Sequence, residues 1–379
     1  MSYQYYDFNT RRKRARRTWL ILAAIVGLLL LCCAYAGKVD PQHFVLAPFM
    51  VLAFMPMMIL TLILVLVALF KRRWLAAFIM ALSVALTMPV LMLYVGMVKS
   101  ANRSPVPADT TLILKVMTYN VLSFNFQEPD LSAQPSASMR LILDANPDVV
   151  LLQEGSARGL NWDEIPSVAP FVDEIKAKYP YCYQSGEGLN LMSKYPFTTV
   201  PLGEPEVGHS PLGYNRDLSS YIARAYDLQL PRGKQLRLID FRLQSYHLSF
   251  GKNPNVRVSP DVKPAPLERM RRSFGLRGDN AKVLRQAIDQ SPANVIMCGD
   301  MNDVSASHVY RVIRGDDLKD AWADAGSGYA RTFNRYHLPF HIDHIFYRGD
   351  VRALDVKRLK GGSSDHYPLL AAFDIDITQ

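Results

Sequence analysis

Three long apolar runs, separated only by short polar segments, fill most of the first hundred residues of the chain. They cover residues 19–36, 44–70 and 74–98, and none of them contains a charged residue. Each is long enough to cross the roughly 30 Å hydrocarbon core of a bilayer as a helix, and membrane helices tolerate the prolines of the second and third runs. Buried core helices are the alternative, but three uncharged runs in succession favour a membrane region over residues 1–98.

Basic residues flank these runs asymmetrically. RRKRARR at 11–17 precedes the first run and KRR at 71–73 joins the second to the third, whereas the loop at 37–43 holds one Lys and one Asp. Because cytoplasmic loops are enriched in Lys and Arg, the pattern predicts an integral inner- or plasma-membrane protein with a cytoplasmic N-terminus. The chain after Val98 is then periplasmic or extracellular. AYA at 34–36 resembles a signal-peptidase site, but the length of the apolar run favours a retained anchor.

Beyond a polar linker at 99–109, the pattern changes to short β-rich runs that alternate with amphipathic stretches. Several of the runs are continuously apolar, as expected of strands buried on both faces. Two sheets packed face to face with helices outside would cover such strands, so residues 110–379 are predicted to form an α/β domain. The expected strands are 111–120, 148–154, 189–196, 220–230, 234–245, 293–300, 341–347, 351–360 and 366–375, and the expected helices are 139–146, 168–179 and 279–290.

Charge is distributed unevenly along the chain. Residues 1–99 contain 11 Lys or Arg and 2 Asp or Glu, so they carry the whole net charge of +9, and the remaining 32 basic and 32 acidic residues cancel. The predicted domain therefore lacks the overall basic charge of many DNA-binding proteins, although a neutral domain can still contain a basic groove. Residues 250–278 are locally basic and contain four prolines. We interpret them as a solvated loop, with a basic flap over an anionic substrate or a contact with lipid headgroups as the alternative.

Acid, amide and imidazole residues stand at the ends of several predicted strands. Phosphoester hydrolysis needs a hard cation for the phosphoryl oxygens, a base for the attacking water, and donors that meet charge in the transition state. Mg²⁺ prefers oxygen ligands and typically takes only one or two carboxylates. The set therefore predicts a Mg²⁺-dependent phosphoester hydrolase. Its residues are Asn120, Glu154, Asp300, Asn302, Asp343, Asp365 and His366.

Glu154, Asp300 and Asn302 also have a purely structural interpretation. Glu154 follows a buried strand, where a carboxylate is costly unless a metal or a donor pairs with it, but it could also be an edge residue that faces solvent. Asp300 and Asn302 could point to the same side of an extended stretch and serve water and phosphate, or could form an Asx turn. Asp343 could accept the second N–H of His366 and favour the charged imidazole.

These motifs resemble those of the endonuclease/exonuclease/phosphatase superfamily, which includes pancreatic deoxyribonuclease, apurinic-site endonucleases, neutral sphingomyelinases and inositol polyphosphate 5-phosphatases. The match spans residues 111–377 through YNVLSFN, DVVLLQE, LMSKYPF, CGDMND, HIDHIF and SSDHYPL. Together these motifs are specific for the superfamily but do not identify a substrate. The resemblance, to a membrane-anchored member of bacterial type, implies a four-layer αββα sandwich of two mixed sheets flanked by helices, with Mg²⁺ or Mn²⁺ as cofactor.

The resemblance also implies a role for each motif residue. A metal lies among amide and carboxylate groups, another carboxylate activates water, and an imidazole that a further carboxylate orients stabilises the phosphoryl oxygens. The implied metal site is Asn120 and Glu154 with Asp365 beside them, the water-activating carboxylate is Asp300, the phosphate-positioning amide is Asn302, and the imidazole is His366, oriented by Asp343.

One motif departs from its usual form in the superfamily. Members often carry N-T-H-L after the strand that reads GKQLRLIDFRL here, and an ungapped alignment puts Asp240, Phe241, Arg242 and Leu243 in its place. Arg242 then stands where a phosphate-contacting histidine is expected, and an arginine can bind phosphate bidentately but cannot donate a proton near neutral pH. His247 could substitute after a register shift, but the strand pattern favours Arg242 as the catalytic and substrate-binding residue.

The sequence thus predicts a membrane-anchored, outward-facing metal-dependent phosphoesterase that uses Mg²⁺ or Mn²⁺. A lipid headgroup, a phosphorylated glycan, and an extracytoplasmic nucleotide or nucleic acid are all compatible substrates, and no obligate protein partner is expected. A nuclease is the alternative among enzymes. A catalytically impaired binding or scaffold protein that retains the fold is the alternative of another class, and Arg242 is its only support.

Overall fold

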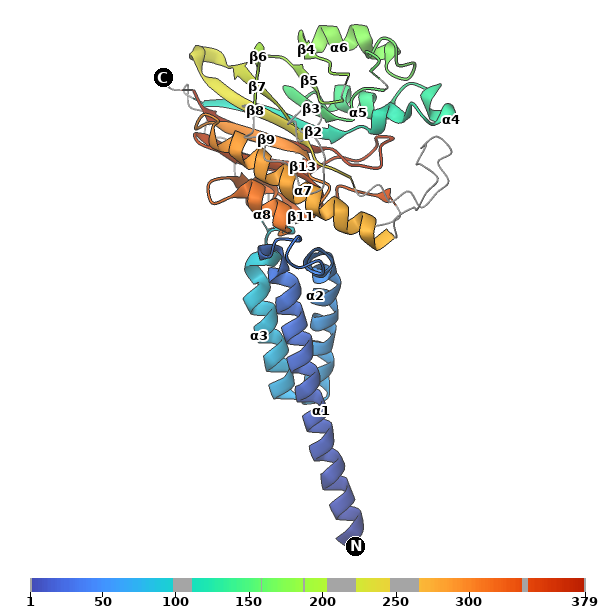
Figure 1. The fold of residues 1–379 in the computed structure, drawn as a ribbon, viewed down its shortest axis with the longest axis vertical. Helices are drawn as coiled ribbons and strands as arrows, with labels where there is room; N and C mark the ends of the chain where they lie inside the picture. Colours follow the sequence, from blue (N-terminus) through green and yellow to red (C-terminus); the bar gives the residue numbers. More distant parts are fainter. Residues whose placement is uncertain are drawn as a thin grey trace. The chain divides into compact units, whose positions relative to one another are not determined.

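The chain folds into two compact units, whose elements are drawn in Figure 1. The first unit comprises Met1–Met92 with Ala306–His308, and the second comprises Leu93–Ser305 with Val309–Gln379. The functional residues expected from the sequence all fall within the second unit. The computed structural model describes residues 2–97, 111–157, 159–186, 188–202, 223–245, 266–335 and 340–377.

Helices form the first unit, and each of its three long helices packs against the other two. Large apolar side chains remain on its surface, and Leu66, Phe70 and Phe78 are 67%, 84% and 63% exposed. Each helix contains a segment long and apolar enough to cross a membrane, so all three are candidate membrane spans. The helices are α1 (Ser2–Tyr35), α2 (Ala47–Phe70) and α3 (Trp74–Leu91), and the candidate spans are Arg12–Lys38, Ala47–Phe70 and Trp74–Leu91.

The third apolar run is shorter as a helix than the sequence predicts. Helix α3 ends at Leu91, shortly after Pro89, rather than at Val98. Strand β1 (Val95–Met97) follows it and pairs with β11 (Ser327–Tyr329). A Cβ on Gly96 would lie 2.4 Å from the backbone of Gly326, so this pairing requires a glycine, and the apolar run continues as a strand rather than as a helix.

Within the described residues, two six-stranded sheets form the core of the second unit, in addition to the two-stranded pair of β1 and β11. Each is mixed, because β2 runs parallel to β3 and β8 runs parallel to β9, while the other pairs are antiparallel. In order, one sheet is β13 (Val351–Arg358), β14 (Leu369–Asp376), β2 (Thr111–Asn120), β3 (Val149–Gln153), β5 (Asn190–Ser193) and β4 (Tyr181–Tyr183). The other is β10 (Lys319–Asp320), β12 (Asp343–Arg348), β9 (Val295–Asp300), β8 (Gln235–Arg242), β7 (Ala223–Gln229) and β6 (Phe197–Val200).

The side chains of each strand alternate between two separate apolar cores. In β2, Leu114 and Val116 pack between the two sheets, whereas Met117 and Tyr119 pack on the outer face with helices α5 and α6. The second sheet uses its outer face in the same way to pack against α7 and α8. The expected four-layer αββα sandwich is therefore confirmed. The helices of this unit are α4 (Pro129–Ser132), α5 (Ala137–Ala145), α6 (Val172–Lys178), α7 (Pro266–Asp289), α8 (His308–Arg314) and α9 (Ala321–Ala325).

The interpretation of residues 250–278 as a solvated loop is wrong for residues 266–278. These residues form the first half of α7, which begins at Pro266 rather than near Asp279. Proline is well tolerated at a helix start, and Phe274 and Arg277 in this half are buried against the domain. Residues 250–265 lie outside the described part of the chain, so the flap alternative is untested there. Short edge strands such as β4, β6 and β10 were not predicted, because so few residues carry little periodicity.

Candidate active site

The predicted functional residues gather at one edge of the sandwich, where parallel strands end. Asn120 is the last residue of β2 and Glu154 directly follows β3, its parallel neighbour. Arg242 and Asp300 end the parallel strands β8 and β9 and stand opposite each other in register. Strands β2 and β3 also contact β8 and β9 across the sandwich, so all four strand ends meet at one place.

Asp300 is held by three hydrogen bonds and is only 1% exposed. Its Oδ1 accepts the backbone N–H of Asn302 at 2.8 Å, and its Oδ2 accepts the side-chain amides of Asn302 and Asn120 at 3.1 and 3.0 Å. Burial raises the pKa of Asp300 to about 6, with a further rise from Asp343 that the nearby His366 opposes. The carboxylate is therefore fixed in direction and more basic than an ordinary aspartate.

A tight turn after β9 produces this geometry. Asn302 has φ +52°, in the left-handed region, and its backbone N–H donates to Oδ1 of Asp300, so the structure confirms the Asx-turn alternative rather than the extended one. The two side chains nevertheless converge, because the turn brings the Asn302 amide onto Asp300 and onto the carbonyl of Leu243, at 2.9 Å. A Cβ on Gly299 would lie 1.8 Å from the carbonyl oxygen of Phe241 in β8, so only glycine allows the two strands to approach at this point.

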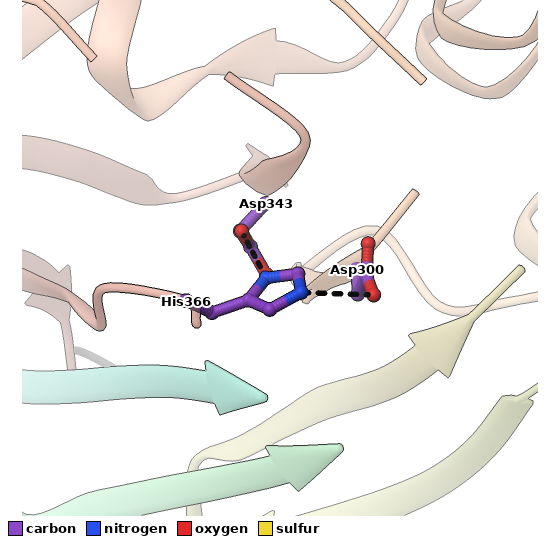
Figure 2. A group of neighbouring side chains, drawn as sticks. All are labelled: Asp300, Asp343 and His366. Carbon is purple, nitrogen blue, oxygen red and sulfur yellow. Dashed lines mark hydrogen bonds and ion pairs between the residues drawn. The ribbon is translucent and has the colours of Figure 1, made fainter. Parts of the chain in front are cut away.

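His366 lies between two carboxylates (Figure 2). Its Nδ1 is 2.9 Å from Oδ2 of Asp343, the first residue of β12, and its Nε2 is 3.9 Å from Oδ2 of Asp300. Burial lowers the pKa of His366, but the charges of Asp343 and Asp300 outweigh it and raise the pKa to about 10. The ring is therefore an imidazolium at neutral pH, with one N–H fixed by Asp343 and the other directed toward Asp300.

Neighbouring residues that the sequence did not single out hold His366 in place. Its backbone N–H donates to Oγ of Ser364, which itself donates to the carbonyl of Asn120 at 2.7 Å. The ring of Phe333 packs edge-on against the imidazole, with centroids 5.2 Å apart. Asn125 donates its amide to the hydroxyl and the carbonyl of Ser363. In the sequence, only the two serines of the SSDHYPL motif pointed to these contacts, and nothing in the sequence pointed to Phe333.

Carboxylate oxygens suited to a divalent cation lie beside this pair, whereas the amide oxygen of Asn120 already accepts the backbone N–H of Leu122 at 3.1 Å. Oε1 of Glu154 accepts the Asn120 amide at 3.0 Å. Oδ1 of Asp365 is buried and has no hydrogen-bond partner among the described residues. Burial raises the pKa of Asp365, and although His366 and Arg335 oppose the rise, the negative charge of Glu154 adds to it. A buried carboxylate oxygen without a partner, close to a second carboxylate, fits a hard cation such as Mg²⁺ or Mn²⁺.

A second group of possible ligand atoms occurs among the described residues. Atoms of Asp300, Asp343 and His366 lie within 4.8 Å of one another. The Nδ1 of His366 is already bonded to Asp343, and a protonated ring cannot bind a metal. The contacts of His366 with Asp343 and Asp300 fit proton and charge chemistry, and the carboxylates of Glu154 and Asp365 lie outside this group.

Two arginines contact the carboxylates of Glu154 and Asp365. Nη2 of Arg242 lies 2.7 Å from Oε1 of Glu154, and Nη1 of Arg335 lies 3.6 Å from Oδ2 of Asp365. Arg242 lies at the site, but His247 lies outside the described residues, so the choice between the two stays a prediction. Arg335 was missed, because it precedes β12 in a loop without a recognisable motif.

Directly behind the site, one buried pair joins the two sheets. Nε2 of Gln153 in β3 donates to Oδ1 of Asp240 in β8 at 2.6 Å. The other oxygen of Asp240 has no hydrogen-bond partner among the described residues, and the residue is fully buried. Burial raises the pKa of Asp240 well above its usual value, although Gln153 and Arg224 oppose the rise. The strands that carry Glu154 and Arg242 are therefore linked one and two residues before those side chains.

The structure thus brings together every predicted site residue that it describes. Their roles remain predictions, whereas their proximity is observed. The residues are Asn120, Glu154, Arg242, Asp300, Asn302, Asp343, Asp365 and His366.

Comparison with known proteins agrees with the fold and the motifs. Residues 117–366 match the model of the endonuclease/exonuclease/phosphatase family, and residues 16–94 match a domain of unknown function (DUF8431). No curated protein matches the chain.

Solved structures of similar fold come from both bacterial and human proteins. An endonuclease/exonuclease/phosphatase from Beutenbergia cavernae is 19% identical with a TM-score of 0.46, and the match covers 69% of this chain and 72% of that one. The human Nocturnin catalytic domain is 18% identical with a TM-score of 0.45, covering 72% and 98%. A Bacteroides vulgatus endonuclease/exonuclease/phosphatase is 17% identical with a TM-score of 0.46, covering 70% and 99%. These likenesses are too distant to carry an argument about activity.

Proposed function

The chain belongs to the endonuclease/exonuclease/phosphatase family, and from that premise we propose that it is a metal-dependent phosphoester hydrolase. One observation carries the proposal. A buried basic carboxylate and a buried imidazolium, Asp300 and His366, face each other at 3.9 Å. Beside them, Asp365 keeps a carboxylate oxygen without a protein partner among the described residues. A base, a cationic donor and a metal ligand in one place are the three groups that phosphoester hydrolysis requires.

In the proposed reaction, each of these groups has one task. Asp300, with a pKa raised by burial to about 6, is ionised at pH 7 and accepts a proton from the attacking water. The Nε2–H of His366 donates to a phosphoryl oxygen as negative charge develops there. Asp343 holds the imidazolium in the required orientation. A divalent cation held by Glu154 and Asp365 would supply further neutralisation of the phosphoryl oxygens.

Turnover of a generic phosphodiester tests this proposal. We expect the full chain, purified in detergent, to hydrolyse bis(para-nitrophenyl) phosphate with Mg²⁺ or Mn²⁺, and to lose that activity in excess EDTA because the assigned ligands are hard oxygen atoms. Readdition of the cation should restore the rate. The His366→Ala variant is the matched test of the imidazolium. Full activity in EDTA, or an unchanged rate in His366→Ala, would refute the proposal.

We further propose that the catalytic unit is anchored to a membrane and faces away from the cytoplasm. Support comes from the three candidate spans and from the basic segments at 11–17 and 71–73, which favour the cytoplasmic side. A bacterial alkaline phosphatase fused after Gln379 should then be active, whereas a fusion after Arg73 should be inactive. The reverse result would overturn the orientation. In this location a phospholipid headgroup, a phosphorylated glycan or an extracytoplasmic nucleotide is accessible.

A further inference from the structure

Two permanently charged side chains lie at the proposed metal site. Arg242 reaches Glu154 from the end of β8, and Arg335 reaches Asp365 from the segment that precedes β12. The side chains of Arg242 and Arg335 are 34% and 56% exposed, so both are accessible from solvent. Neither is needed for the tasks of base, imidazolium or metal ligand. A role for the pair must therefore come from what they add to the site, which is positive charge.

The two arginines determine the sign of the net charge of the site. The carboxylates are Glu154, Asp300, Asp343 and Asp365, and the cationic groups among the described residues are His366, Arg242 and Arg335. With one divalent cation, positive charges exceed negative charges by one. Without the two arginines, negative charges would exceed positive charges by one, and the site would repel an anion rather than attract it.

We propose that the site is specific for a terminal phosphoryl group, which carries two negative charges, and disfavours the singly charged phosphodiester. This inference rests on the proposed function and names its substrate class as a phosphomonoester or the terminal phosphate of a pyrophosphate. Arg242 and Arg335 are its specificity-determining residues. A diester carries only one negative charge, which the metal ion and His366 can neutralise. The two arginines therefore stabilise a bound diester less than a bound monoester.

The geometry of Arg242 suits this role. Its Nη2 faces Glu154, while its Nε–H is buried and has no hydrogen-bond acceptor among the described residues. A guanidinium carries donors on both Nη atoms as well as on Nε, and the oxygens of a terminal phosphoryl group can accept from two of them at once. The Arg242 side chain is 34% exposed, so an incoming phosphoryl group can engage the exposed part of its guanidinium, although not the buried Nε–H. A diester has two of its four oxygens covered by carbon, which leaves fewer acceptors for a second arginine.

The reaction at a terminal phosphoryl group balances with water as the only co-reactant. The water oxygen forms a bond to phosphorus as the bond between phosphorus and the leaving oxygen breaks. The electron pair of the broken bond departs with the leaving oxygen. One water proton passes to Asp300 and from there to solvent, and the other remains on the inorganic phosphate product.

Two substrates with the same leaving group test the inference. Para-nitrophenyl phosphate is a monoester and bis(para-nitrophenyl) phosphate is a diester, and both release para-nitrophenolate. With the full chain in detergent and Mg²⁺ at pH 8, we expect kcat/KM to be higher for the monoester. Arg242→Gln and Arg335→Gln should each lower kcat/KM for the monoester by about 10- to 100-fold, the range for losing a hydrogen bond to a charged group. The loss for the diester should be smaller.

Arg352→Gln is the matched control. Arg352 also pairs with a carboxylate, Asp374, but in register this pair stands beside Ile113, seven residues from Asn120 and about 23 Å along the strand. This variant should behave as wild type toward both substrates. Inhibition by inorganic phosphate gives a second readout, and each active-site variant should need about tenfold more phosphate for half-inhibition. Arg242→Lys, which keeps the charge, should recover part of the monoester rate.

The results separate this inference from the proposed function. Hydrolysis of neither substrate in the presence of metal would contradict the proposed function itself. Metal-dependent hydrolysis with a higher kcat/KM for the diester would leave the proposed function intact and overturn the inference. Equal losses for both substrates in the two arginine variants would overturn it as well, because the arginines would then support turnover without selecting charge.

Discussion

Replacing Asp300 with asparagine should lower kcat for metal-dependent phosphoester turnover by about 10²- to 10⁴-fold, the range that a positioned general base contributes. Asparagine has nearly the same shape but no charge, so it cannot take a proton from water. In the wild type, three N–H groups of Asn302 and Asn120 donate to the two carboxylate oxygens of Asp300. The asparagine side chain has only one oxygen to accept these hydrogen bonds. Steady-state rates with bis(para-nitrophenyl) phosphate and saturating Mg²⁺ measure the effect.

The control for this prediction must separate lost chemistry from lost structure. Asp374 is a buried carboxylate near the C-terminal end of β14, whereas His366 precedes the N-terminal end of that strand. Asp374 pairs with Arg352. Asp374→Asn removes the ion pair with Arg352, away from the proposed site, and should therefore keep the wild-type kcat. Thermal unfolding of both variants shows whether either substitution disturbs the fold. If Asp300→Asn unfolds at the wild-type temperature and keeps its kcat, Asp300 is not the base.

The sequence predicted those site residues that stand at the ends of strands. Apolar periodicity located β2, β3 and β9 to within one or two residues, and the polar residue after each apolar run was therefore placed at the correct edge. The orientation of His366 by Asp343 was also expected, and the structure has the bond at 2.9 Å. Parallel strands bring their carboxyl ends to one edge, so residues far apart in sequence converge without any local signal of contact.

Contacts that depend on the packing of loops against one another were not predictable. Phe333 reaches His366, and Arg335 reaches Asp365, because residues 332–334 pair with residues 365–367 outside the main sheets. Such isolated pairing leaves no periodic pattern in the sequence. The start of α7 was missed for a related reason, since the prolines before it resemble those of a loop until Pro266 takes the first helical position.

The partnership of Gln153 with Asp240 was hidden for a different reason. The two residues lie in different sheets, and the hydrogen bond between them exists only once the sheets have packed. Asp240 was noticed only as part of the segment that aligns with N-T-H-L. In the structure it is a fully buried carboxylic acid, whose second oxygen has no hydrogen-bond partner within the described residues. A buried group of this kind costs stability when it must ionise.

We therefore expect Asp240→Asn to stabilise the protein by about 1 to 3 kcal/mol near pH 8. Burial raises the pKa of Asp240, so the folded state holds a proton that the unfolded state releases above its own pKa of about 3.9. The free energy of unfolding then falls as pH rises from about 4 toward the raised value. Asparagine still accepts from Gln153 but has no such proton to hold, so this decline should disappear.

Thermal unfolding of the purified full chain between pH 5 and pH 8 measures both effects, namely the higher midpoint and the weaker dependence on pH. Asp227→Asn is the matched control, because Asp227 lies in the same hairpin but is partly exposed and paired with Arg237. Removing that charge should lower the midpoint or leave it unchanged, which is the opposite of the result for Asp240. A lower midpoint for Asp240→Asn at pH 8, with the wild-type dependence on pH, would mean that Asp240 is ionised in the folded protein. Its charge would then hold the two strands behind the site together, instead of opposing their packing.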